Sequence, residues 1–166
     1  MEFRLCKGST LTHQALHQYN ISHSHTMTSI PGRATVPGKG GNMTYHLTIL
    51  GRLSGFNEYV NACRTNRHKG NKLIQDAEET VIWQIKQQLK GVHINKPVIL
   101  KYDFYEPNKK RDLDNISGFA HKVIQDALVK AGVLKDDGWR EITGYLDQFY
   151  CDPQNPRIEV TIVEVE

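Results

Sequence analysis

The feature that most constrains the fold is a run of apolar residues at helical spacing in the last third of the chain. Side chains that recur at steps of three and four residues share one face of an α-helix, and that face must be buried. Asn115 is placed to cap the start of this helix, and Gly132 is placed to end it. We therefore predict a long amphipathic helix over about 116–131, with its buried face formed by Ile116, Phe119, Ala120, Val123, Ile124, Ala127, Leu128 and Ala131.

Weaker patterns on both sides predict strands and one more helix. Alternating apolar residues predict strands over about 45–49, 97–104, 141–150 and 157–165. A second helix is expected from about 72 to 90, whereas residues 52–72 have the composition of a basic loop. This order predicts a single α+β domain in which a mixed β-sheet is covered by two main α-helices.

The chain has two parts of different composition. Residues 1–42 are rich in Ser, Thr, His, Gly and Pro, so we expect a disordered or appended segment before a folded domain over 43–166. That segment holds four of the 21 basic and one of the 18 acidic residues, which leaves the domain without net charge. Any binding of nucleic acid must therefore depend on local clusters of basic residues.

Several classes of protein are disfavoured by what the chain lacks. No apolar run approaches the roughly 20 residues that cross a bilayer, and no secretory h-region stands near the start, so we expect a cytoplasmic protein. Cys6, Cys63 and Cys151 are odd in number and far apart, which argues against a zinc site or a disulfide framework.

Two acidic pairs are the candidate metal ligands. Asp112 and Asp114 stand just before the long helix, and in an extended backbone both carboxylates would project to one side. Oxygen ligands of this kind suit Mg²⁺ or Mn²⁺. Asp136 and Asp137 follow the helix, and we expect an antiparallel return to bring them near the first pair. The alternatives are helix capping by the first pair and a D-D-G turn at the second.

Lys122 is a candidate for binding a phosphate. It lies seven residues after Asn115, on the same face of the predicted helix, and a side chain that points back along the helix would approach the first acidic pair. There it could stabilise developing negative charge. The alternative, which the spacing alone favours, is a solvated ion pair with Asp126 one turn further on.

Two basic clusters are candidate contacts for nucleic-acid phosphates, although a solvated surface is the default interpretation of such runs. They consist of Arg64, Arg67 and Lys69 in the first cluster and Lys109, Lys110 and Arg111 in the second.

The string K-K-R-D-L-D-N-I-S-G-F-A-H-K-V-I-Q-D-A-L-V-K-A-G-V-L-K-D-D-G-W, residues 109–139, resembles the RusA family of Holliday junction resolvases in the form carried by phages and prophages. The order of elements from about 43 to 165 is also similar to that family. The resemblance implies a small homodimer of mixed α/β fold that binds four-way DNA junctions and cuts two symmetric strands with Mg²⁺.

Carried over residue by residue, the resemblance implies Asp112 and Asp114 as metal ligands and Asp137 as the third essential acid, with Asp136 beside it. Lys122 corresponds to the family's catalytic lysine. Shorter family members have that lysine four residues after the second Asp, where this chain has Gly118, so one helical turn is inserted here.

We therefore predict a Mg²⁺-dependent endodeoxyribonuclease that acts as a homodimer on branched DNA. A nuclease for another branched or flapped DNA would share the same chemistry. A DNA-junction-binding module without catalysis, in which the acids serve as caps and turns, is the alternative from a different class.

Overall fold

A computed structural model describes residues 3–4, 10–11, 35–37 and 42–166. The chain divides into two units, residues 1–32 and residues 33–166. In the first unit, β1 (Phe3–Arg4) pairs antiparallel with β2 (Thr10–Leu11). The prediction of a disordered or appended segment over 1–42 concerns mainly residues that lie outside this description.

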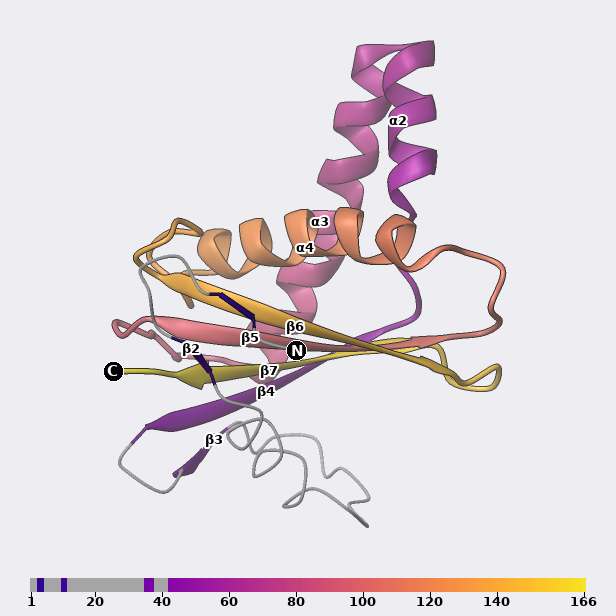
Figure 1. The fold of residues 1–166 in the computed structure, drawn as a ribbon. Helices are drawn as coiled ribbons and strands as arrows, with labels where there is room; N and C mark the ends of the chain where they lie inside the picture. Colours follow the sequence, from indigo (N-terminus) through magenta and orange to yellow (C-terminus); the bar gives the residue numbers. More distant parts are fainter. Residues whose placement is uncertain (1–2, 5–9, 12–34, 38–41) are drawn as a thin grey trace. The chain divides into compact units, whose positions relative to one another are not determined.

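The second unit is built on a five-stranded sheet of order β3-β4-β7-β5-β6 (Figure 1). The strands are β3 (Thr35–Pro37), β4 (Met43–Leu50), β5 (Val98–Glu106), β6 (Ile142–Cys151) and β7 (Arg157–Glu164). All neighbours pair antiparallel except β5 and β6, which are parallel. The predicted mixed sheet and the four predicted strands are confirmed.

Three helices, rather than the two predicted, accompany this sheet. They are α2 (Phe56–Thr65), α3 (Arg67–Gln88) and α4 (Leu113–Lys130). The expectation of a loop over 52–72 is wrong, because α2 and the first turns of α3 occupy most of it. The helix α2 has only ten residues, and none of them is fully buried. The Asn66 side chain accepts a hydrogen bond from the backbone N–H of His68 and so caps α3.

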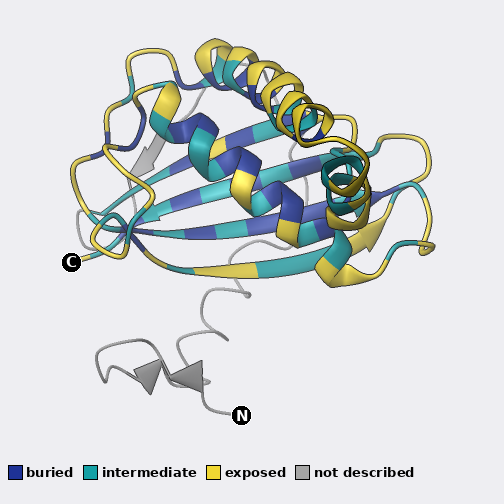
Figure 2. Ribbon diagram, turned by 90° about the horizontal axis from the view of Figure 1, so that it is seen from above, coloured by how far each residue is buried: buried dark blue, intermediate teal, exposed yellow. Residues whose placement is uncertain are grey.

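The core lies between α3, α4 and one face of the sheet. Figure 2 shows buried positions alternating with intermediate or exposed ones along α4, and with intermediate ones along the strands β5 and β7. Phe119 and Ile124 of α4 pack in the same cluster as Tyr102 and Phe104 of β5. Burial raises the pKa of Tyr102 above its usual value, whereas its hydrogen bond from Gln125 acts in the opposite direction. The face predicted for the long helix is buried, with Ala131 partly so.

Two glutamine side chains of α3 accept hydrogen bonds from backbone N–H groups of β4. The backbone N–H groups of Thr48 and Leu50 donate to the side-chain oxygens of Gln88 and Gln84, at 2.8 and 2.7 Å. These bonds complete the hydrogen bonding of β4 beyond the short strand β3, which pairs only with residues 43–45. The end of α3 is thereby held along β4.

The parallel pairing of β5 and β6 has a topological consequence for α4. Parallel strands need a crossover, and α4 makes it by returning from the end of β5 to the start of β6. The other side of β6 is an edge of the sheet, and Tyr145, Leu146 and Tyr150 are exposed along that strand. Residues before and after α4 therefore lie near opposite ends of the helix.

Within the described part of the chain, no helix combines the length and the apolar character needed to cross a membrane.

Gly70 marks the closest approach of α2 and α3. A Cβ on Gly70 would lie 2.2 Å from the Cys63 sulfur, whereas a Cβ on Gly118 would meet nothing nearer than 3.8 Å. We expect Gly70→Ala to lower the free energy of unfolding by about 1–3 kcal/mol through overpacking. Gly118→Ala should raise it by up to about 1 kcal/mol through helix propensity. Urea unfolding of both variants measures the difference.

The double variant Cys63→Ala/Gly70→Ala provides a control, because it removes the sulfur that the new methyl group would meet. It should recover part of the stability that Gly70→Ala loses. Equal stability of Gly70→Ala and wild type would contradict the close approach.

Candidate active site

The first acidic pair lies at the start of α4. Asp112 is the N-cap residue, with φ −69° and ψ 153°, and Asp114 lies in the first turn. The cap is therefore Asp112 and not Asn115, and the pair spans a strand-to-helix junction rather than an extended backbone. Both residues are exposed, and neither carboxylate has a hydrogen-bond or ion-pair partner among the described residues. Two unpaired carboxylates at a helix N-terminus, which itself favours anions, are free to bind a hard cation.

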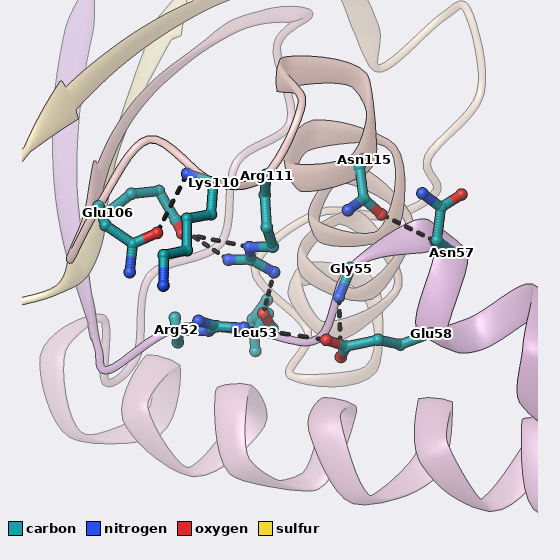
Figure 3. A network of polar contacts seen from close by, with 10 residues as sticks. Arg52, Leu53, Gly55, Asn57, Glu58, Glu106, Lys110, Arg111 and Asn115 are labelled. Atoms are coloured by element: carbon teal, nitrogen blue, oxygen red, sulfur yellow. Dashed lines mark hydrogen bonds and ion pairs between the residues drawn. The ribbon is translucent and has the colours of Figure 1, made fainter.

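Arg111, directly before this pair, belongs to an internal polar network (Figure 3). Its guanidinium donates to both carboxylate oxygens of Glu106, at 2.6 and 3.2 Å, and to the backbone oxygen of Leu53 at 3.0 Å. The side chains of Arg111 and Glu106 are only 11% and 9% exposed. The structure thus uses Arg111 to hold the 52–55 segment, which removes it from the set of free phosphate contacts.

Asn115, directly after the pair, bonds to a different helix. Its Oδ1 accepts a hydrogen bond from the backbone N–H of Asn57 at 2.8 Å, so it caps α2 rather than α4 (Figure 3). A Cβ on Gly55 would lie 2.6 Å from that same oxygen. Glycine at position 55 is therefore required for the close approach of Asn115. The Glu58 side chain completes the start of α2 by accepting from the Gly55 N–H at 3.3 Å.

A groove of about 530 Å³ lies beside Asp112. Its walls come from the end of β5, the loop after it, the first turn of α4 and the end of β6. Polar and apolar residues both contribute, and the lining consists of Glu106, Asn108, Lys109, Arg111, Asp112, Leu113, Ile116, Phe149, Tyr150 and Cys151. Asp112, which is exposed, thus forms part of the wall of an open groove.

Lys122 reaches away from the first acidic pair. Its Nζ lies 2.7 Å from Oδ1 of Asp126, and the side chain is 59% exposed. The expectation that it points back along α4 is not met; the ion pair with Asp126, the alternative interpretation, is formed. The hydrogen bond to Asp126 raises the pKa of Lys122 above its usual value, and the charge of Asp137 also contributes to this rise. Lys122 is therefore cationic at neutral pH, and it interacts electrostatically with Asp137.

The second acidic pair is not brought to the first. Asp136 and Asp137 are exposed, and the Asp137 N–H donates to Oδ1 of Asp136 at 2.9 Å, as in a turn. The expected antiparallel return is wrong, because β5 and β6 are parallel and α4 separates the pairs. A helix of 18 residues is about 27 Å long. In the described part of one chain, no three Asp, Glu, His or Cys side chains are grouped so that they could hold a metal ion.

The remaining basic candidates are exposed in two places. Arg64, Arg67 and Lys69 lie where α2 joins α3, and Lys109 and Lys110 lie in the loop before Asp112. No ion pair with an acid involves any of these five side chains within the described residues. There is no acidic residue between Glu58 and Asp76, so the α2–α3 connection carries an uncompensated positive charge.

Sequence reasoning missed the partners of this site. The contacts of Asn115 with Asn57 and of Arg111 with Leu53 join segments 58 residues apart, for which the sequence has no local signal. Glu106 is only five residues from Arg111, but its burial, which makes it a partner, is decided by the packing of β5. Sequence reasoning also missed a hydrogen bond of 2.8 Å between Nε2 of His121 and Asp147, which ties α4 to β6. The sequence identifies Asn115 as a capping residue, but the helix that it caps is α2 and not the predicted helix that follows it.

Comparison with known proteins agrees with this arrangement. The profile of the family described as endodeoxyribonuclease RusA matches residues 57–163. The crossover junction endodeoxyribonuclease RusA of Aquifex aeolicus (strain VF5) is 34% identical over 77 residues. That alignment covers 43% of this chain and 58% of the relative, so it spans less than two thirds of the relative's length.

The ion pair of Arg111 and Glu106 yields a stability prediction. Arg111→Ala leaves the Glu106 carboxylate buried without its cation, so we expect the free energy of unfolding to fall by about 3–5 kcal/mol. Lys110→Ala, at the exposed neighbouring position, should change it by less than about 0.5 kcal/mol. Denaturant unfolding measures both, and similar values for the two variants would contradict the structural role of Arg111.

Proposed function

The chain belongs to the RusA family of endodeoxyribonucleases, and on this premise we propose that it is a cytoplasmic, Mg²⁺-dependent enzyme that resolves four-way DNA junctions by paired symmetric nicks. The observation that carries the proposal is the pair of unpartnered carboxylates at the start of α4, beside a groove and a basic loop, inside the region that matches the family. The name of the Aquifex relative supports the choice of a crossover junction as substrate.

Asp112 and Asp114 fit a hard divalent cation by their donor chemistry, because both offer free carboxylate oxygens. A bound Mg²⁺ would supply a water of lowered pKa and stabilise negative charge on the scissile phosphate. Lys109 and Lys110, exposed next to Asp112, would hold the DNA backbone over the groove. The cationic Lys122, and Asp136 next to Asp137, would act where the second acidic pair meets the substrate.

The separation of Asp112 and Asp114 from Asp137 supports a homodimer in which the site is shared. Pairing the β6 edges of two chains across a two-fold axis would set the strands antiparallel. The end of β6 in one subunit, near Asp112 and Asp114, would then face the start of β6 in the other, near Asp137 of the partner subunit. Each subunit would thus complete the other's site, and two equivalent sites would match the two-fold symmetry of a four-way junction.

One observation favours a second candidate. In the described part of one chain no three acidic or other ligating side chains are grouped for a metal, as expected of a junction-binding module without catalysis. Such a protein would bind a four-way junction without regard to Mg²⁺ and would be indifferent to Asp137→Asn. A nuclease for other branched DNA would instead cut flaps or forks as fast as junctions.

Substitution of the acids tests both the activity and the shared site. Homodimers of Asp114→Asn or of Asp137→Asn should not nick a labelled four-way junction in Mg²⁺, although both should still bind it. Refolding an equal mixture of the two variants should restore about a quarter of the wild-type nicking, because each mixed dimer contains one fully wild-type shared site. A single site leaves most junctions nicked once, without resolution.

Sites built within one chain would leave the mixture inactive, because every site would then carry a substitution. A linear duplex of the same sequence and a reaction in EDTA serve as controls. Junction cleavage that persists in Asp137→Asn, or wild-type cleavage that persists in EDTA, would contradict the proposed metal site.

The basic cluster at the α2–α3 connection generates a further prediction. Replacing Arg64, Arg67 and Lys69 by Ala should weaken junction binding equally for different sequences. It should also reduce the slope of log K against log[salt] by about 0.9 for each phosphate that the variant no longer neutralises. Lys86→Ala/Lys90→Ala, near the other end of α3, is the matched control and should keep the wild-type slope.

Fluorescence anisotropy at a series of salt concentrations measures the slope for each protein. An unchanged slope in the triple variant would exclude Arg64, Arg67 and Lys69 as phosphate ligands.

A further inference from the structure

The helical hairpin of α2 and α3 presents its basic end away from the sheet. Figure 1 shows the hairpin rising from the layer of α4, with the α2–α3 connection at the end most distant from the strands. We call residues 56–77 the arm and residues 64–72 its tip. The tip carries Arg64, Arg67, Lys69 and Lys72, all exposed. The contact of Gly70 with Cys63 packs the two helices tightly there, so the tip moves with the arm.

The base of the arm rests on the helix that carries the first acidic pair. The rings of Tyr59 and Phe119 lie 5.9 Å apart, and Phe56 approaches Gly118. Apolar contacts have little directionality, whereas the hydrogen bond from the Asn57 N–H to the Asn115 side chain is directional and constrains how the start of α2 lies against α4. Asn115 is the residue that follows Asp114. Asn115, which supports the arm, and the acidic pair therefore lie in the same turn at the start of α4.

We infer that Asn115 is a positioning residue, which holds the basic arm in register with Asp112 and Asp114 so that DNA bound at the tip presents one particular phosphate to the acids. The inference rests on the proposed nuclease function. Asn115 touches neither the substrate nor a metal in this role; it acts through α2. Gly55 is the second half of the joint, because only a residue without a Cβ leaves room for the Asn115 oxygen.

The length of the arm makes its angle important. Ten residues of α2 extend about 15 Å from base to tip. A tilt of about 15° at the base would move the tip by about 4 Å, which is close to the rise of about 3.4 Å per nucleotide along one DNA strand. Loss of the joint should therefore shift or spread the cut by one nucleotide or more, without removing any group that binds DNA or metal.

Three variants separate the joint from its surroundings. Asn115→Ala removes the acceptor of the Asn57 N–H, whereas Asn115→Asp keeps an oxygen in the same place. Asn57→Ala is the control, because the donor is the backbone and its own side chain takes no part in the bond. If Asn115→Ala fails to fold, Gly55→Ala tests the same joint, since its Cβ would lie 2.6 Å from the Asn115 oxygen and displace it.

The readout is the position of the cut, mapped at single-nucleotide resolution on an end-labelled four-way junction. We expect one principal cut per strand for the wild type and Asn57→Ala. Asn115→Ala or Gly55→Ala should give cuts spread over two or more neighbouring phosphates, with junction affinity within about threefold of wild type. Asn115→Asp should return the cut to its wild-type position even if its rate is lower. A single cut at the wild-type phosphate in Asn115→Ala would overturn the inference.

A second measurement needs neither metal nor cleavage. Amide hydrogen exchange at Asn57 should be protected in the wild type and in Asn115→Asp and at least tenfold faster in Asn115→Ala; equal rates would overturn the joint. Failure of the proposed nuclease function and failure of the proposed role of Asn115 would give different results. A wild type that cuts nothing refutes the proposed nuclease, whereas a wild type that cuts one phosphate beside an Asn115→Ala variant that does the same refutes only the role of Asn115.

Discussion

The burial of one face of α4 against the sheet is the interaction on which the rest of the structure depends. This face contributes most of its apolar residues to the core, from Ile116 to Leu128. Gln125 and His121 of the same helix contact Tyr102 of β5, the strand that lies between β7 and β6. Because α4 is also the crossover between the parallel strands β5 and β6, its burial determines the positions of the residues that directly precede and follow it. The acids at its start are held near the end of β5, and those after it are held near the start of β6.

The same helix organises the polar groups at its N-terminus. Arg111 and Asn115 stand on either side of the first acidic pair, and both reach across to the segment that begins α2. The carboxylates of Asp112 and Asp114 are left unpaired between these two contacts. Neighbours in sequence are thus divided into residues that build the scaffold and residues that remain free for chemistry. The ion pair with Glu106 shows that a basic residue beside a candidate site can belong to the scaffold.

Much of the fold could be predicted because it depends on local periodicity. The buried face of α4 and the strands β4 to β7 follow patterns of two, three or four residues, and the mixed sheet is expected from the order of these elements. The helix α2 escapes prediction because it has only ten residues and none of them is fully buried, although its apolar side chains gather on one side. The acids Asp112, Asp114 and Asp137 could be selected by residue type and by resemblance to a family. Their mutual placement could not, because it depends on the direction in which β6 runs, and that direction is decided by the pairing of β6 with β5 and not by residues next to the acids in the sequence.

The order of most elements, the buried face of α4, the family and the acidic and basic residues available for chemistry can all be predicted from the sequence. Each of these depends on residues close together in the chain or on a continuous motif. Four features follow instead from the packing of the whole domain: Asn115 caps α2, Arg111 is paired internally, Lys122 turns to Asp126, and in the described residues the two acidic pairs are not grouped into one site. The reason is physical: such contacts join segments whose separation in space is set by packing of the whole core, and no local pattern of side chains encodes that distance.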